Sequence, residues 1–322
     1  MKKMTKIMAA AVLLIYLIPG SVFGAEVLVP VGQVVGLELR DETVSVAAFD
    51  EILGAKAKEA GVRVGDRILR LDGQTVRTAE DVRRILARSD GLVDAVLVRD
   101  GKEVKVCLEP EITSDGPKLG MYLRQGVTGI GTVTWYDPAT GKFGTLGHGV
   151  SDSKGRLLDL AAGSAYYARV MAVKKGQPGE PGQLMGALES RTPAGTLTAN
   201  TEKGVFGISQ TGWEGKTVEV GSPEEVKTGK ATVLSTVSGN EVREYSVEIG
   251  KIYSKAKGNG RNLLLKVTDP ALLEATGGIV QGMSGSPLVQ DGKLIGAVTH
   301  VLVNDPTMGY GIFIENMLEA AG

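Results

Sequence analysis

Cysteine, histidine and net charge are all scarce in this chain of 322 residues. A single cysteine excludes an internal disulfide, so the fold must be held together by its hydrophobic core. Two histidines are too few for most zinc sites, and neither an H-E-x-x-H nor a C-x-x-C spacing occurs. The net charge of −1 gives no electrostatic case for nucleic acid. We therefore expect no metal, no cofactor and no nucleic-acid partner.

Long hydrophobic runs are lacking as well. The apolar run Ile7–Ile18 is shorter than the roughly 20 residues that a membrane-spanning helix needs. Three lysines precede it, Pro19-Gly20 ends it, and small residues follow at Gly24-Ala25, which is the order of an export signal. We predict a signal peptide or membrane anchor over residues 1–25. Whether it is cleaved stays open, but the lack of a nearby cysteine excludes a lipoprotein anchor.

Glycine is abundant, with 45 residues, while aromatic residues make up 5% of the chain. Glycine together with many valines and threonines favours a mainly β structure that is rich in turns. The length fits about two domains. The lone Cys107 lies in the alternating run Val104–Leu108, so we expect it to pack in a strand rather than act as a nucleophile.

Residues 27–112 predict a small α+β domain. A short helix over Ala55–Gly61 is closed by glycine, and a strand and an Asp72-Gly73 turn follow it. Thr78 is the predicted N-cap of an amphipathic helix whose apolar face carries Val82, Ile85 and Leu86. A terminal hairpin around Asp100-Gly101 completes the domain.

The segment Ala60–Leu69, with Asp72-Gly73 behind it, resembles the PDZ family. The resemblance implies a groove in which a peptide or C-terminal tail adds as a strand. Val35, Gly36 and Leu37 would then form the loop that binds the peptide carboxylate, because glycine lets the backbone N–H groups approach it closely.

Residues 113–322 predict a second domain built of many short strands. The segment Gly129–Tyr136, a turn, and Phe143–Val150 form one hairpin, and similar strand-turn-strand patterns continue to Asn262–Val267. A helical period returns only at Ile314–Ala321. This pattern favours a β-barrel or sandwich.

The motif with the clearest chemistry is Gln281–Pro287, in which Ser284 stands between glycines. Such a turn can expose a serine hydroxyl and direct neighbouring backbone N–H groups at one point. Acyl transfer requires both a nucleophile and fixed oxyanion donors.

Two histidines are available as a general base. His148 lies between two glycines at the end of the predicted hairpin, where both nucleophile and substrate could reach it. His300 follows a strand interior and is less open. For the carboxylate that orients the base, Asp269 and Asp152 are both available, and the residues alone do not choose between them.

The Gly282–Val289 segment and the following Asp291-Gly292 hairpin resemble the nucleophile hairpin of chymotrypsin-like serine proteases. Together with Gly147-His148-Gly149, Thr268-Asp269-Pro270, the PDZ-like domain and the export signal, they resemble the stage IV sporulation protein B peptidase family. The implied fold is a chymotrypsin-like double β-barrel behind a PDZ domain.

This resemblance implies that Ser284 is the nucleophile, His148 the general base and Asp269 the third member of the triad, with the N–H groups of Gly282 and Ser284 as the oxyanion hole. It implies a sporulation endopeptidase that is exported into the space between the forespore and mother-cell membranes. It also implies self-cleavage and cleavage of a membrane-bound regulator, which activates an intramembrane protease and then a late sigma factor. Asp269 lies between His148 and Ser284, as the acid does in the wider chymotrypsin-like class. It lies only fifteen residues before Ser284, however, whereas in that class the acid lies well before the serine.

Two other functions fit the same residues. One is a non-catalytic PDZ scaffold with a degenerate protease domain, and the other is a general envelope quality-control serine protease. The domain order argues against a quality-control protease, because PDZ domains usually follow the protease domain in that class, whereas the PDZ-like segment comes first here. Cleavage-site preference, the PDZ ligand and the oligomeric state are not encoded in any motif that we can interpret.

Overall fold

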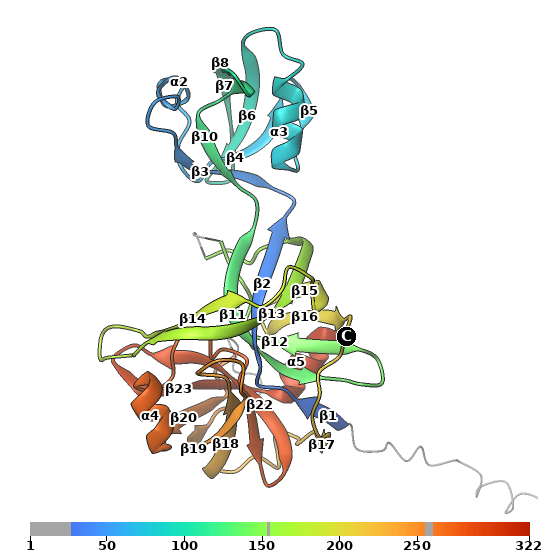
Figure 1. Ribbon diagram of the computed structural model, residues 1–322, viewed down its shortest axis with the longest axis vertical. Coiled ribbons are helices and arrows are strands. Elements are labelled where there is room, and N and C mark those ends of the chain that lie inside the picture. Colours follow the sequence, from blue (N-terminus) through green and yellow to red (C-terminus); the bar gives the residue numbers. More distant parts are fainter. Residues whose placement is uncertain (1–26, 153–154, 255–259) are drawn as a thin grey trace, which may run out of the picture.

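The computed structural model describes residues 27–152, 155–254 and 260–322. The export segment predicted over residues 1–25 lies outside this part of the chain. Within the described residues, no helix combines the length and hydropathy that a membrane span needs. Figure 1 shows a small domain connected through two neighbouring strands to a larger body that contains the other strands.

The first barrel is closed by hydrogen bonds between its terminal strands. Its strand order is β12-β16-β15-β13-β2-β11, and a further pairing of β11 with β12 completes the ring. The short strands β1 and β17 extend the sheet beyond β11, and β14 pairs with β13. The strand bounds are β1 Val27–Pro30, β2 Val34–Asp41, β11 Val127–Tyr136, β12 Lys142–Thr145, β13 Leu160–Lys174, β14 Gln183–Leu188, β15 Gly195–Thr201, β16 Gly204–Ser209 and β17 Val218–Glu219.

The second barrel is closed in the order β18-β19-β20-β23-β22-β21. Two helices accompany it: α4 follows β20, and α5 ends the chain over the residues predicted for it. The bounds are β18 Gly229–Ser235, β19 Arg243–Ile252, β20 Leu263–Val267, α4 Pro270–Thr276, β21 Pro287–Gln290, β22 Lys293–Leu302, β23 Asp305–Phe313 and α5 Ile314–Ala321.

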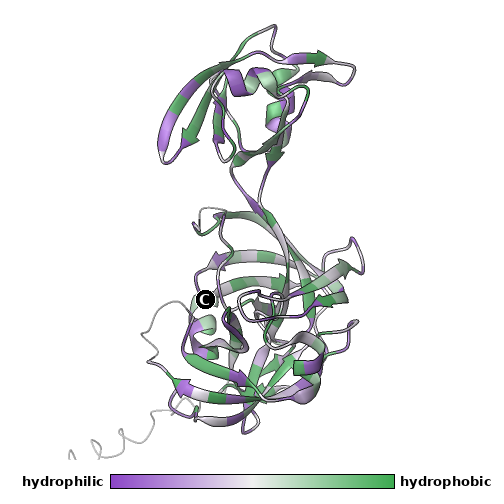
Figure 2. Ribbon diagram, turned by 90° about the vertical axis from the view of Figure 1, so that its left-hand side faces the viewer, coloured by the Kyte–Doolittle hydropathy of each residue, from purple (hydrophilic) through white to green (hydrophobic). Residues whose placement is uncertain are grey.

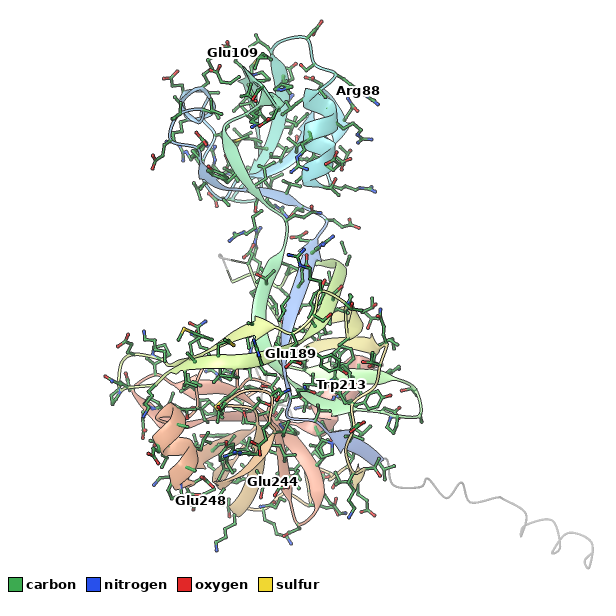
Figure 3. The ribbon with its side chains drawn as sticks, in the orientation of Figure 1. Arg88, Glu109, Glu189, Trp213, Glu244 and Glu248 are labelled. Carbon is green, nitrogen blue, oxygen red and sulfur yellow. The ribbon has the colours of Figure 1, made fainter. Side chains whose placement is uncertain are left out.

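Apolar side chains alternate along the barrel strands, as Figure 2 shows by the alternating colours of the ribbons. In the first barrel, Trp213, labelled in Figure 3, packs against the rings of Tyr136, Phe143 and Tyr167. A separate buried cluster joins the two barrels and α5, and it includes Trp135 and Met317. The barrels therefore share a continuous apolar contact, which fixes any site formed between them.

The small domain consists of a sheet in the order β10-β3-β4-β6-β7 and two helices. Thr78 caps α3 as predicted, because its side chain accepts from the backbone N–H of Asp81 while the Asp81 carboxylate accepts from Thr78 N–H. The bounds are β3 Val44–Phe49, α2 Ala55–Glu59, β4 Arg67–Leu71, β5 Gln74–Thr75, α3 Ala79–Leu86, β6 Val93–Arg99, β7 Lys102–Leu108, β8 Glu111–Thr113, β9 Gly116–Lys118 and β10 Met121–Arg124.

The predicted boundary at residues 112 and 113 is wrong. Strand β2 pairs with β11 on one side and β13 on the other, so residues 27–41 belong to the first barrel. Strand β10 pairs with β3, so residues 121–124 belong to the small domain. The small domain is therefore inserted between β2 and β11. Sequence patterns missed this because the strand partners lie far apart along the chain.

The prediction for Cys107 is half right. It lies in a strand, β7, but its side chain is exposed. The register explains this, because Leu108 is buried and adjacent residues of a strand point to opposite faces.

Candidate active site between the barrels

Ser284 lies in the tight loop that connects α4 to β21. Gly282 and Gly285 flank it with φ angles of +99° and +95°, which glycine adopts without strain. A Cβ on Gly285 would lie 2.0 Å from the carbonyl oxygen of Thr132 and 2.6 Å from the nitrogen of Leu146. The loop is thus pressed against the first barrel, and position 285 accepts only glycine.

Thr132, in β11 of the first barrel, fixes this loop by two hydrogen bonds. Its hydroxyl donates to the carbonyl oxygen of Gly282 over 2.8 Å, and its backbone N–H donates to the carbonyl oxygen of Ser284 over 3.0 Å. Both carbonyls are thereby turned toward the first barrel. Sequence reasoning missed Thr132, since a threonine in a strand gives no signal of this role.

The N–H groups of Gly282 and Ser284 donate no hydrogen bond within the described residues. Other N–H groups of the loop are bonded, including those of Met283, Gly285 and Ser286. An oxyanion hole requires two such unbonded donors, here the N–H of Ser284 itself and the N–H of Gly282, two residues before it. The predicted role of Gly282 and Ser284 remains a prediction that this geometry permits.

The hydroxyl of Ser284 donates to the carbonyl oxygen of Thr299, over 2.8 Å. It therefore does not donate to His148 in this structure. Ser286 differs sharply: it is fully buried, and its hydroxyl donates to the hydroxyl of Ser235 over 3.0 Å. This contrast agrees with the choice of Ser284 rather than Ser286 as the predicted nucleophile.

His148 follows β12 after a backbone segment in an unusual conformation. Leu146 and Gly147 both have positive φ angles, +69° and +68°. For a bulky residue such as Leu146 this costs roughly 1–2 kcal/mol, and such strain is concentrated at functional sites. A Cβ on Gly147 would also lie 2.8 Å from a methyl group of Thr299 in the second barrel. The sharp bend turns His148 toward β22.

The imidazole of His148 is oriented by its own chain. Its Nδ1 lies 3.0 Å from the carbonyl oxygen of Gly149. A carbonyl can only accept, so Nδ1 carries the proton and Nε2 has the free lone pair of a base. Nε2 makes no hydrogen bond to a described residue. Burial lowers the pKa of His148, and the Gly149 carbonyl offsets part of this effect.

His300, in β22, lies beside His148 with ring centroids 5.3 Å apart. It directly follows Thr299, the residue that accepts from Ser284, so His300 lies next in the chain to the hydrogen-bond partner of Ser284. The Nδ1 atom of His300 is buried without a hydrogen-bond partner. Burial, with smaller contributions from the charges of His148 and Arg261, lowers the pKa of His300 to about 4. Sequence reasoning had placed His300 in a strand interior and had not joined it to the site.

The assignment of Asp269 as the orienting acid receives no support from this geometry and stays a prediction. Asp269 is the N-cap of α4, and one of its carboxylate oxygens accepts from the backbone N–H groups of Ala271 and Leu272. The other accepts from the N–H of Ser246 over 3.2 Å. No hydrogen bond joins Asp269 to His148. The Asp-Pro pair that suggested a strand exit is a helix start.

Asp152, the alternative acid, lies in the turn that follows His148. Arg156 donates to it from its backbone N–H and, over 2.9 and 2.6 Å, from Nε and Nη2. Its carboxylate is thus engaged in closing the turn. Among the described residues, no group of three or more His, Cys, Asp or Glu side chains could hold a metal ion.

The predicted carboxylate-binding loop of the PDZ-like domain is also wrong. Val35, Gly36 and Leu37 lie within β2 and pair with β11 and β13 on both sides, so their N–H groups are not grouped in a loop. The segment Leu119-Gly120-Met121, which repeats the same apolar-Gly-apolar pattern, enters β10 at the edge of the small domain's sheet. Leu119-Gly120-Met121 lies beside helix α3, whereas Gly36 does not.

A cavity of about 950 Å³ opens between α3 and β10 in the small domain. Leu119, Gly120 and Met121 form one side, and Val82 and Arg83 of α3 form the other. Strand β10 pairs only with β3, so its outer edge is free to accept another strand.

Known proteins resemble the two parts of the chain separately. Residues 52–99 match the family model of the PDZ domain. The "Putative zinc metalloprotease mll0638" of Mesorhizobium japonicum is 36% identical over 23% of this chain and 20% of its own length. The "Putative zinc metalloprotease Atu1380" of Agrobacterium fabrum is 36% identical over 30% of this chain and 25% of its own length. The chain thus spans only a fifth to a quarter of these relatives.

Among solved structures, the PDZ domain of an SdrC-like protein from Listeria monocytogenes shares 17% identity, with a TM-score of 0.23, over 26% of this chain and 87% of its own. The inactive form of the Rv3671c protease shares 14% identity, with a TM-score of 0.34, over 61% of this chain and 85% of its own. Residues 115–318 match the family model described as SpoIVB peptidase S55. Because that match covers more than half of the chain, the protein belongs to the SpoIVB peptidase S55 family.

Proposed function

We propose that the protein is a serine endopeptidase in which Ser284 is the nucleophile and His148 the general base. The observation that carries the proposal is that both residues approach neighbouring residues of β22: Ser284 Oγ donates to the Thr299 carbonyl, and the His148 ring lies 5.3 Å from the His300 ring. The N–H groups of Ser284 and Gly282 are unbonded within the described residues. Membership of the S55 peptidase family supports the same reaction class.

The reaction begins when Ser284 leaves its hydrogen bond with Thr299. His148 Nε2 removes the serine proton while Oγ attacks the carbonyl carbon of the substrate. The N–H groups of Gly282 and Ser284 stabilise the oxyanion, and losing one such donor typically costs about 100–1000-fold in rate. The imidazolium then protonates the leaving amine, and water hydrolyses the acyl-enzyme by the reverse route.

In this scheme the Gly149 carbonyl takes the place of the third catalytic residue. It accepts from Nδ1–H over 3.0 Å, which keeps the tautomer with a free Nε2 and holds the ring in position. A carboxylate would do the same and would also stabilise the imidazolium charge more strongly.

The PDZ-like domain supplies a second contact with the substrate. A peptide or C-terminal tail would add as a strand to the free edge of β10, with its carboxylate near Leu119-Gly120 and the cations of α3. Substrate capture in this groove would raise the local concentration of the target at the active site.

The biological setting that we propose follows from the family resemblance. The protein is exported in sporulating cells and acts between the forespore and mother-cell membranes. There it cleaves itself and a membrane-bound regulator of an intramembrane protease, and so starts activation of a late sigma factor.

The direct test compares the full-length protein with its Ser284→Ala variant. Wild type should take a fluorophosphonate label at Ser284 and process itself, while the variant should fold and lose about a millionfold in turnover. Mass spectrometry reports the label, the signal cleavage and the self-cleavage sites together. Self-processing by the purified variant would refute the proposal, and absence of the label from wild type would favour a non-catalytic scaffold.

The sporulation role is tested separately, in a deletion strain. Loss of spore formation with normal growth under heat is expected. A heat-sensitive strain that forms normal numbers of spores would instead indicate an envelope quality-control protease.

A further inference from the structure

A second cleft lies on the first barrel, between strands that also contact the nucleophile loop, the segment over residues 277–286 that carries Ser284. It has a volume of about 560 Å³, and its lining includes Gly36 of β2, Ile130 of β11, and Gly186 and Leu188 of β14. Nothing in the reaction described above uses it.

Strand β14 leads from the nucleophile loop into this cleft. The N–H of Leu184 donates to the carbonyl oxygen of Gln281, and a Cβ on Gly282 would lie 3.0 Å from Leu184. Two residues further along the strand, Gly186 faces Ile130, and after two more, Leu188 covers Gly36. At about 3.3 Å per residue, Leu188 lies roughly 13 Å along the strand from Leu184.

The far wall is joined to the same loop through β11. Ile130 lies two residues before Thr132, which bonds the carbonyl groups of Gly282 and Ser284. Ile130 also packs on the buried cluster that contains Met283 of the loop. The cleft therefore begins two residues along β11 and β14 from Thr132 and Leu184, the positions that contact the loop.

The two sides of Ser284 differ. On one side β22 offers the carbonyl of Thr299 as an acceptor for a peptide N–H. On the other side lie β11 and β14 with the cleft between them. An extended peptide that ran from β22 across Ser284 would continue toward the cleft on the far side of the scissile bond.

Glu38, Tyr166 and Arg191 also line the cleft, but its exposed apolar surface favours an apolar side chain. Leu188 is 49% exposed, although it is a large apolar residue, and Ile130 is partly buried beside it. Covering such surface is worth about 25 cal/mol per Å². The glycines at positions 36 and 186 keep the floor low, because a Cβ on Gly36 would lie 2.3 Å from the Leu188 side chain.

We propose that this cleft is a specificity subsite that binds an apolar side chain of the substrate two to four residues from the scissile bond, on the side away from β22. The residue count follows from the positions of Gly186 and Leu188, two and four residues along β14 from Leu184, since an extended peptide also advances about 3.3 Å per residue. The inference rests on the proposed endopeptidase function and names which part of the substrate is selected.

The test profiles cleavage of a peptide library by the full-length protein and its variants. For wild type, peptides with Leu at one of these positions should be cut faster than peptides with Gly there. In Leu188→Ala, this Leu-to-Gly ratio of kcat/KM should fall about tenfold. In Thr128→Trp, which fills the cleft from a neighbouring exposed position of β11, the preference should shift to small residues.

The matched control is Ile208→Ala. Ile208 lies in β16, is 40% exposed and does not line the cleft, so this variant should keep the wild-type ratio. An active Leu188→Ala protein with an unchanged profile, or a change confined to the β22 side, would overturn the inference alone. A wild-type protein that cuts no peptide and takes no fluorophosphonate label would overturn the proposed function instead.

Discussion

The Nδ1–H of His148 donates its orienting hydrogen bond to a neutral carbonyl, that of Gly149. A neutral acceptor interacts about half as strongly with an imidazolium as a carboxylate does. The transition state, in which the imidazole gains a proton, is therefore stabilised less than in a complete triad. A slow enzyme that cuts few bonds is the expected result, and this is compatible with a signalling role.

Substitution of Asp269 tests the proposal that the Gly149 carbonyl, and not the Asp269 carboxylate, orients His148. Asn is as good an N-cap as Asp, so Asp269→Asn should keep both the start of α4 and full cleavage activity. Asp269→Ala should lose about 0.5–2 kcal/mol of stability with little change in kcat, because it removes the cap and the bond from Ser246 N–H but no contact with His148. Urea unfolding and peptide kinetics measure the two effects. Loss of activity in a fully folded Asp269→Asn protein would restore the acid to the catalytic group.

Titration of His300 should make the free energy of unfolding depend on pH. Its folded pKa of about 4 lies below the ordinary value of about 6.5, so the unfolded chain binds more protons between these pH values. The neutral form is favoured in the fold, and stability is lost as the pH falls from about 6.5 to about 4, by at most about 3 kcal/mol.

The measurement is the free energy of unfolding from urea titrations at pH 7 and pH 4.5, for wild type and His300→Gln. The variant should lose less stability across this interval, because it lacks the titrating group. Parallel losses in the two proteins would contradict the assignment. At pH 7 and 8, where the imidazole is neutral in both states, neither protein should show a pH effect from this residue.

At the scale of elements, β11 connects the two barrels through hydrogen bonds. It pairs with β2, β1 and β12 in the first barrel, and through Thr132 it holds the nucleophile loop that belongs to the second. Displacement of this strand would move Gly282 and Ser284 together. The N–H groups proposed as oxyanion donors are therefore positioned by the first barrel, although the second barrel carries them.

Thr132→Val should separate this role from simple packing. The variant keeps the backbone bond to Ser284 but loses the hydroxyl bond to Gly282, so we expect roughly 1 kcal/mol of destabilisation and a fall in kcat of about tenfold. The matched control is Thr134→Val on the same strand, because the Thr134 hydroxyl is buried without a partner. It should be neutral or stabilising, and equal effects on kcat in both variants would contradict the positioning role of Thr132.

Local signals in the sequence predicted local structure well. The Thr78 cap, the hairpin that ends near His148 and the terminal helix at Ile314 all depend on neighbouring residues, and the structure confirms them. The partners of β2, the contact of Thr132 with Gly282 and the approach of His300 to His148 depend on residues far apart in the chain. No periodicity or motif records such contacts, and for that reason the PDZ loop was assigned incorrectly.

On the scale of the whole molecule, the PDZ-like domain is attached by two adjacent links. β2 ends at Asp41 and β3 begins at Val44, while β10 ends at Arg124 and β11 begins at Val127. Gln125 secures the junction, since its amide donates to the carbonyl oxygens of Asp41 and Arg77 and accepts from Ala79 N–H. The links are short, so movement of the domain is transmitted to the paired strands β2 and β11.

Removing the inserted domain should leave an active peptidase. Because Leu39 pairs with Val127, replacement of residues 41–125 by an Asn-Gly turn would convert β2 and β11 into a hairpin. We expect the shortened protein to take the fluorophosphonate label and to cut short peptides at the wild-type rate, but to lose cleavage of targets that bind the PDZ groove. An unfolded product, seen by circular dichroism, would show that the barrel needs the insertion to form.

The insertion also has a consequence for how the chain assembles. Roughly 85 residues separate β2 from its partner β11, and closing a flexible loop of that length costs about 4 kcal/mol of entropy. When the PDZ-like domain folds first, the pairing of β3 with β10 brings both chain ends together before the barrel forms. During synthesis, β1 and β2 emerge early and must wait without partners until β11 is made. The inserted domain, once folded, thus lowers the entropic cost of pairing β2 with β11. Variants that destabilise it should delay folding of the peptidase even where every residue of the active site is intact.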